Sequence, residues 1–165
     1  MRTPTAAAGS VLFFAIAPGV VAGVVPWWLT GWQARGPLAH WAPVRIAGLI
    51  LLIAGALVLV QAFARFVTDG RGTPAPAAPA ERLVIGGLYR YVRNPMYLAV
   101  VAAITGQAFA LGQPVLLSYA AAVWVTTAAF ARWHEEPALA RQFGAQYEAY
   151  RREVPAWRPR TRPWK

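Results

Sequence analysis

The chain lacks cysteine altogether, and it has only two histidines and few charged residues among its 165 residues. The absence of cysteine excludes disulfide scaffolds, thiol nucleophiles and cysteine-ligated metals, and two histidines leave little material for a zinc or haem site. Charged residues make up 13% of the chain and apolar residues 58%, which is the wrong balance for an ordinary soluble domain. We therefore expect a single all-α membrane domain over residues 1–165, with no metal site.

Four long apolar runs supply the candidate membrane spans, since a spanning helix needs about 20 mostly apolar residues. They are residues 11–29, 46–67, 95–111 and 115–133. The first run contains Pro18 and Pro26, so we expect a kink, which lipid tolerates only where neighbouring helices or side chains satisfy the freed carbonyls. In the second run, Gly48 and Gly55 favour close helix packing. A tight turn at residues 112–114 makes the last two runs an antiparallel hairpin.

Basic residues set the predicted orientation, because lysines and arginines near span ends stay on the cytoplasmic side. Four spans place both termini and a flexible loop at residues 68–80 on one side. That side carries all six acidic residues and every basic residue except Arg35 and Arg45. The opposite end has a cluster of tryptophans typical of an interfacial belt: Trp27, Trp28, Trp32 and Trp41. Both termini and any polar chemistry are thus expected at the cytoplasmic face.

A first polar segment covers residues 86–97 and reads G-G-L-Y-R-Y-V-R-N-P-M-Y. Asn94 suits a helix cap and Pro95 suits the first helical position, so the third span should begin here with free backbone N–H groups. Such a helix start carries a positive dipole end that binds anions, and Arg90 and Arg93 lie beside it. A ligand carboxylate or phosphate would find several donors here. The alternative interpretation is a capped helix with arginines that reach toward water.

A second polar segment follows the fourth span, where Glu135 and Glu136 stand next to each other before Pro137. Because residues before proline avoid helical geometry, we expect the helix to break at Glu136. A break would let both carboxylates point to one place, where they could bind ammonium or ribose hydroxyl groups. The alternative is that they complement the dipole of the next helix. The neighbouring His134 could carry a proton or simply fill the interface.

Beyond the break, residues 137–153 are predicted to form one amphipathic interfacial helix, either packed over the bundle or acting as a lid. Its aromatic and aliphatic stripe consists of Leu139, Phe143, Tyr147 and Tyr150. Residues 154–165 form a basic, aromatic tail, for which anionic lipid headgroups are nearer partners than RNA, so no nucleic acid is expected. Gln107, inside the third span, is more typical of an interhelical hydrogen bond than of a catalytic group.

The R-Y-V-R-N-P-M-Y run and the later E-E-P-x-L-x-x-x-F-G-x-x-Y-x-x-Y run together resemble the isoprenylcysteine carboxyl methyltransferase and phospholipid methyltransferase group. The resemblance covers about residues 81–159. It implies an integral membrane enzyme that binds S-adenosylmethionine at the cytoplasmic face, beneath the carboxyl-terminal segment. Carried over residue by residue, it implies a cofactor site made of Tyr89, Tyr91, Arg93, Asn94, Pro95, Tyr97, Glu135 and Glu136.

Two positions depart from the family pattern. Asn94 stands where the family commonly has histidine, and Ala99 stands where it commonly has glycine. Asparagine keeps the hydrogen bonding of histidine and loses its titratable proton. A mechanism that needs an imidazole at this position is therefore not expected.

The expected reaction is methyl transfer to a lipophilic acceptor, with Glu135, Glu136 and Arg132 as the candidate catalytic residues. A carboxylate acceptor would need only orientation by Arg132 or Arg93, whereas an amine acceptor would need a base such as Glu135, Glu136 or His134. Lipids, quinone-like molecules and small lipophilic carboxylates, amines or thiols all stay open as acceptors. The alanine, glycine, proline and arginine content is typical of a high-GC bacterium, so the bacterial cytoplasmic membrane is the expected location. The alternative function is a non-catalytic scaffold that binds anionic lipid or a partner subunit.

Overall fold

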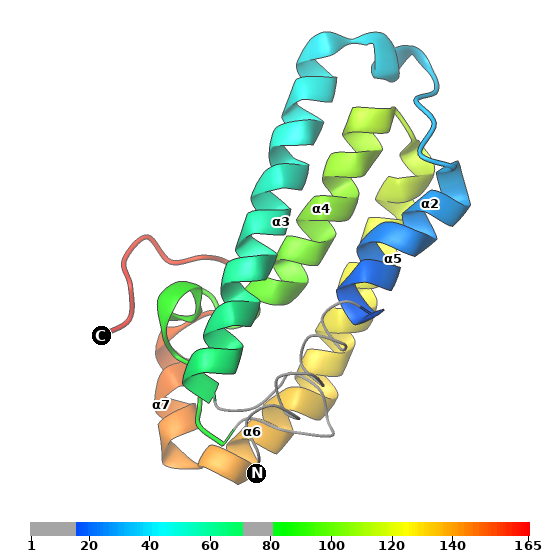
Figure 1. Ribbon diagram of the computed structural model, residues 1–165. Coiled ribbons are helices and arrows are strands. Elements are labelled where there is room, and N and C mark those ends of the chain that lie inside the picture. The colour runs from blue at the N-terminus through cyan, green and yellow to red at the C-terminus, as the bar shows by residue number, and fades with distance from the viewer. Residues whose placement is uncertain (1–15, 71–80) are drawn as a thin grey trace.

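The regular structure is entirely helical in the computed structural model, which describes residues 16–70 and 81–165. The π-helical segments are η1 (Val20–Val24) and η4 (Ala131–Glu135), and the 3-10 segments are η2 (Pro37–His40) and η3 (Gly87–Arg90). The α-helices are α2 (Val25–Thr30), α3 (Ala42–Gly70), α4 (Pro95–Leu111), α5 (Pro114–Phe130), α6 (Glu136–Phe143) and α7 (Ala145–Glu153). Helices α3, α4 and α5 run side by side, with α2 at one end and α6 and α7 at the other (Figure 1). We call these the α2 end and the α6–α7 end.

Within residues 16–70 and 81–165, two helices are long and apolar enough to cross a membrane, Ala42–Asp69 and the continuous helix Pro114–Phe143. Two further apolar helices, Ile16–Thr30 and Pro95–Leu111, are shorter. The all-helical class and the membrane character agree with the sequence, whereas four spans and cytoplasmic termini stay predictions. The start of the predicted first span, residues 11–15, and most of the predicted loop lie outside the described residues.

Glycines bring α3 and α4 into backbone contact, as the sequence predicted for Gly48 and Gly55. A Cβ added to Gly48 would lie 2.5 Å from the backbone nitrogen of Ala110 and 2.7 Å from the carbonyl oxygen of Gly106. A Cβ on Gly55 would lie 2.8 Å from the carbonyl oxygen of Ala99. Since real Cβ contacts are never this short, only glycine permits the approach. Small residues thus hold these two helices together where apolar side chains gain little from leaving lipid.

Pro26 of α2 explains why the helix Ile16–Thr30 contains a π-helical turn. Pro26 has no N–H with which to bond the carbonyl of Ala22, four residues earlier. The π-helical turn just before it, in which the N–H of Val25 bonds the carbonyl of Val20, leaves the carbonyl of Val21 without its α-helical donor. Both are supplied from neighbouring helices: Gln107 Nε2 donates to the oxygen of Ala22 at 2.7 Å, and Tyr119 OH donates to the oxygen of Val21 at 2.8 Å. The helix widens into η1 just before the proline. The expected interhelical role of Gln107 is confirmed, and so is the expected satisfaction of the freed carbonyls.

The predicted break at Glu136 was wrong. Glu136 has helical dihedral angles, φ −58° and ψ −45°, and its N–H bonds the carbonyl of Ala131 across one π-helical turn. This wider turn, η4, accommodates Pro137 without ending the helix, because it shifts the hydrogen-bond register just ahead of the ring. Helix α5 therefore continues through η4 into α6.

The single interfacial helix predicted at residues 137–153 was also wrong. Gly144 has φ 52° and ψ −126°, a conformation that side chains disfavour, and it separates α6 from α7. The turn lets both helices bury their apolar faces in one cluster. That cluster contains the whole predicted stripe together with Val154, and its stripe members are Leu139, Phe143, Tyr147 and Tyr150. The loop that the sequence predicted at residues 68–80 does not begin at residue 68, because α3 continues to Gly70.

Candidate functional site

The segment before α4 is anchored on α3 by a buried tyrosine. Tyr89 packs its ring against Phe66, with 6.5 Å between centroids, and its hydroxyl donates to the carbonyl oxygen of Ala62 at 3.5 Å. The hydroxyl of Tyr150, from α7, donates to the carbonyl oxygen of Tyr89 at 2.7 Å. Burial raises the pKa of both tyrosines well above the usual range, so both stay neutral donors. Tyr89 therefore faces α3 and holds the segment in place.

The start of α4 has the predicted backbone and lacks the predicted side-chain cap. Pro95 occupies the first turn and is buried, and Asn94 occupies the N-cap position with φ −118° and ψ 56°. The Asn94 side chain makes no capping hydrogen bond, because its backbone geometry departs from the usual extended form. The expectation that Asn94 caps the helix through its side chain was wrong. Its amide stays available beside the first backbone N–H groups of α4.

An ion pair joins the two polar segments across 43 residues of sequence. Arg93 Nη1 lies 2.8 Å from Glu136 Oε1, and these side chains are 12% and 11% exposed. The same nitrogen donates to Tyr147 OH at 3.1 Å. Burial raises the pKa of the Tyr147 hydroxyl against the opposing influence of Arg93, so it accepts this bond as a neutral group. The Nε of Arg93 is buried with no protein partner, which leaves one guanidinium donor for a ligand.

Glu136 is surrounded by arginines. Besides Arg93, its Oε2 lies 3.2 Å from Arg132 Nη1 and 3.7 Å from Arg151 Nε. Arg132 is 63% exposed, so its contribution to stability is small. The three arginines neutralise this carboxylate, which therefore serves best to hold Arg93 in position.

Glu135 has a different environment from its neighbour. Its Oε1 accepts a 2.5 Å hydrogen bond from Tyr97 OH. The described arginines that form ion pairs with these two carboxylates all pair with Glu136. The ring of Tyr97 stacks on Trp157 with 6.4 Å between centroids, and Trp157 meets Trp124 edge-on at 6.4 Å. Burial raises the pKa of the Glu135 carboxyl, whereas its hydrogen bond from Tyr97 and the nearby His134 lower it. Glu135 is thus a largely buried carboxyl bonded to a tyrosine whose ring stacks on Trp157. This combination suits a ligand cation.

The carboxyl-terminal tail packs on the first polar segment. Arg160 N donates to the carbonyl oxygen of Tyr91, and Arg93 N donates to the carbonyl oxygen of Pro155. Farther along, Trp164 N donates to the carbonyl oxygen of Arg90. Arg90 Nε in turn donates to the carbonyl oxygen of Trp164 at 2.6 Å. Part of the tail thus packs over the site, where Trp157 contacts both Tyr97 of α4 and Trp124 of α5. The composition of the tail predicted lipid headgroups as its partners, whereas the family resemblance implied that the carboxyl-terminal segment covers the site; neither identified Trp157 as a site residue.

The structure gathers most of the predicted site residues into one place, in contact with one another: Arg93, Tyr97, Arg132, Glu135 and Glu136. Asn94 and Pro95 stand at the adjoining helix start, whereas Tyr89 turns to α3 and Tyr91 offers its carbonyl to the tail. His134 lies outside this cluster, exposed and stacked on Phe130 at 4.9 Å. Among the described residues, no group of three acidic or histidine side chains could hold a metal ion.

The fold and the site together define a class of protein. It is a helical membrane protein with a site of arginine, carboxylate and aromatic side chains at one end of its helix bundle. The family model for phospholipid methyltransferase matches residues 44–146, which is more than half of the chain and includes both polar segments. The chain belongs to this family of membrane methyltransferases. No curated protein and no solved structure matches it at a significant level.

Proposed function

We propose that the protein transfers a methyl group from S-adenosylmethionine to a lipophilic acceptor at the cytoplasmic face of the membrane. Family membership supports methyl transfer. The observation that carries the proposal is the direct contact between the two polar segments, through Arg93 with Glu136 and Tyr97 with Glu135. Because these contacts come from distant segments, they make a single site with donors, an acceptor and aromatic walls.

The side chains of this site match the chemical groups of the proposed cofactor. The unpartnered Nε of Arg93 and the N–H groups at the start of α4 suit its carboxylate. Glu135 suits its ammonium or ribose hydroxyl groups, and the rings of Tyr97 and Trp157 suit its adenine or sulfonium. When bound, S-adenosylmethionine supplies an activated methyl group on a sulfonium. The protein then has mainly to align the acceptor and exclude water.

The residues of the site divide into binding and positioning roles under this proposal. Glu136, neutralised by three arginines, positions Arg93 for the cofactor carboxylate. The exposed Arg132 could orient an acceptor carboxylate that arrives from the membrane boundary. Glu135 is the better candidate base for an amine acceptor, because none of the described arginines forms an ion pair with it. A carboxylate acceptor would thus depend on Arg132 and an amine acceptor on Glu135, so substituting each residue in turn distinguishes the two kinds of acceptor.

The test is calorimetric titration of S-adenosylmethionine and S-adenosylhomocysteine into the full chain purified in detergent. Glu135→Gln and Arg93→Ala should each abolish saturable binding. The matched controls are Glu153→Gln and Arg152→Ala, which change exposed residues of α7 with the same charges. Both controls should bind like the unsubstituted protein.

Two results would contradict the proposal. The first is no heat and no thermal stabilisation at ligand concentrations far above micromolar, where a bound ligand must raise stability by mass action. The second is equal binding in the site variants and the controls. Either result would favour a non-catalytic scaffold that uses the basic residues of this end to bind anionic lipid.

A further inference from the structure

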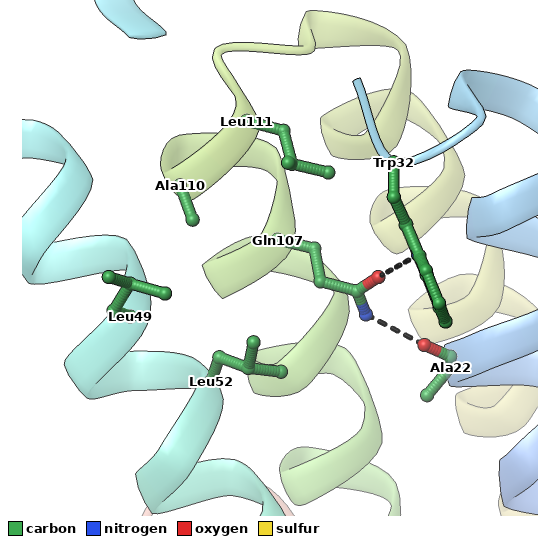
Figure 2. A pocket seen from close by; sticks show the side chains of 7 residues that line it. All are labelled: Ala22, Trp32, Leu49, Leu52, Gln107, Ala110 and Leu111. Atoms are coloured by element: carbon green, nitrogen blue, oxygen red, sulfur yellow. Dashed lines mark hydrogen bonds between the residues drawn. The ribbon is translucent and has the colours of Figure 1, made fainter. Parts of the chain in front are cut away.

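Two apolar cavities, both open to the surface, lie at the α2 end, away from the proposed methyl-transfer site. The first, of about 300 Å³, is lined by Ala22, Trp32, Leu49, Leu52, Gln107, Ala110 and Leu111. Figure 2 shows Leu49 and Leu52 of α3 on one side of the Gln107 side chain, with Trp32 and Ala22 on the other. The second, of about 370 Å³, is lined by Gly19, Gly23, Val24, Trp27 and Trp32. The indole of Trp32 lines both cavities and therefore divides them.

Trp32 is held in this dividing position by specific contacts. Its φ of 53° is in the left-handed region, which a bulky residue adopts only when its surroundings require it. Its indole Nε1 donates to Gln107 Oε1 at 3.2 Å, and its backbone N–H bonds Thr30 Oγ1 at 3.2 Å. The polar atoms of Gln107 are already used by Trp32 and Ala22. What the cavities offer a ligand is consequently apolar surface.

Positive charge borders the apolar surface at this end. Arg35 N donates to the carbonyl oxygen of Leu111, which puts Arg35 next to a residue of the first cavity. Arg45 lies one helical turn before Leu49 on α3, and so shares its face. Both arginines are exposed, and no acidic residue occurs in the chain before Asp69 to neutralise them. An anion is therefore the complementary group for this border.

We propose that the α2 end binds one diacyl phospholipid, with one acyl chain on each side of Trp32 and the phosphate near Arg35 and Arg45. Two apolar cavities divided by one indole match two hydrocarbon chains, and two unneutralised arginines match one phosphate. The lipid belongs to the leaflet opposite to the methyl-transfer site if the predicted spans hold. It is a bound structural lipid, distinct from the methyl acceptor.

The test uses the full chain in phosphatidylglycerol nanodiscs that contain a trace of phosphatidylglycerol with a diazirine near the end of one acyl chain. After illumination, mass spectrometry maps the adducts. We expect adducts concentrated at residues 22–32, 49–52 and 107–111. Leu49→Trp fills the first cavity and should lower labelling at 107–111 by about tenfold, because the chain loses its buried apolar contact there.

Matched controls separate cavity binding from general contact with lipid. Ile50→Trp adds the same indole one residue away, at a more exposed position that lines neither cavity, and should leave the labelling unchanged. Arg35→Gln with Arg45→Gln should lower the labelling of both cavities, whereas Arg141→Gln with Arg152→Gln at the opposite end should not. Binding of S-adenosylhomocysteine should persist in Leu49→Trp, which shows that the variant is folded and keeps the two proposals independent.

Three outcomes would overturn this inference. Labelling spread evenly over the exposed faces of α3 and α5 would show that the cavities hold no particular chain. Equal effects of Leu49→Trp and Ile50→Trp would exclude the cavity as the cause. Cross-linked protein dimers in place of lipid adducts at residues 22–32 would assign the surface to a second copy of the chain.

Discussion

Both ends of the molecule contain a π-helical turn just before a proline, but the side chains around the two turns differ. At the α2 end, η1 stops two residues before Pro26, and at the α6–α7 end, η4 stops two residues before Pro137. In each case a π-helical turn lets the helix continue past a residue that cannot donate a hydrogen bond.

The surroundings decide what each turn does. The first turn is contacted by the neutral side chains of Gln107 and Tyr119, which donate to its freed carbonyls and lock it in place. The second turn ends at Glu135, and Glu136 follows it, so two successive carboxylates face the start of α4. In this molecule, the π-helical turn that is bonded by neutral donors has a structural role, and the one that carries charge contributes to the candidate site.

The largest expected effect on stability comes from breaking the buried ion pair at the α6–α7 end. Arg93→Ala leaves the carboxylate of Glu136 buried with two weaker partners, and should lower the free energy of unfolding by about 3 kcal/mol. Thermal or denaturant unfolding in detergent measures the loss. Arg93→Ala combined with Glu136→Gln should be less destabilised than Arg93→Ala alone, because no buried charge is left unpaired. Additive losses would contradict the pairing.

The next largest effect should come from the contact between α3 and α4, which links the two ends. Gly48→Ala places a methyl group against the backbone of Ala110, and should cost roughly 1 to 3 kcal/mol as overpacking. Gly19→Ala is the matched control, because a Cβ there meets nothing within 4 Å. Unfolding midpoints of the two variants give the comparison. Equal midpoints would show that the helices do not depend on this close approach.

A smaller loss of stability is expected at the π-helical turn of the α2 end, which is bonded by neutral side chains. Gln107→Leu removes the donor to the carbonyl of Ala22 and the acceptor for the indole of Trp32, and should cost about 1 to 2 kcal/mol. S-adenosylhomocysteine should still bind this variant, since Gln107 belongs to the other end of α4. If Gln107→Leu kept its stability and lost S-adenosylhomocysteine binding, the ligand would depend on the α2 end, which would contradict the proposed site at the α6–α7 end.

The smallest effect should come from Tyr119→Phe, which removes one hydroxyl and keeps the ring. The carbonyl of Val21 then loses its donor at a half-exposed position, which should cost about 0.5 to 1 kcal/mol. A thermal unfolding scan beside Gln107→Leu measures the order of the two. A larger loss for Tyr119→Phe would show that the carbonyl five residues before the proline matters more than the one four residues before it.

Helix positions that depend on local chemistry could be predicted from the sequence. The helix α4 runs from Pro95 to Leu111, as the predicted third span does, because a proline at the first turn and Gly112 after the last set both ends. An antiparallel hairpin then brings the start of α4 and the end of the next helix to the same end of the bundle. That topology places the two polar segments at the same end, the family resemblance implied that they form one site, and the ion pair between Arg93 and Glu136 itself was not predicted.

Other features depended on contacts that no local pattern contains. The rule that residues before proline avoid helical geometry failed at Glu136, because a π-helical turn relieves the clash on which the rule rests. Trp157 joins the site from a segment with no periodicity, so nothing in the tail pointed to Tyr97. Two adjacent carboxylates also look equivalent in sequence, and only the arrangement of three arginines separates Glu136 from Glu135.

Hydrogen–deuterium exchange of the full chain, with and without S-adenosylhomocysteine, tests most directly whether the charged π-turn is the functional one. We expect slower exchange on ligand addition at residues 89–97 and 131–157, and no change at residues 20–32, where the neutral π-helical turn lies. Glu135→Gln should abolish the protection and Gln107→Leu should preserve it. Protection centred on residues 20–32, or no protection at a ligand concentration that saturates the calorimetric titration, would contradict the account.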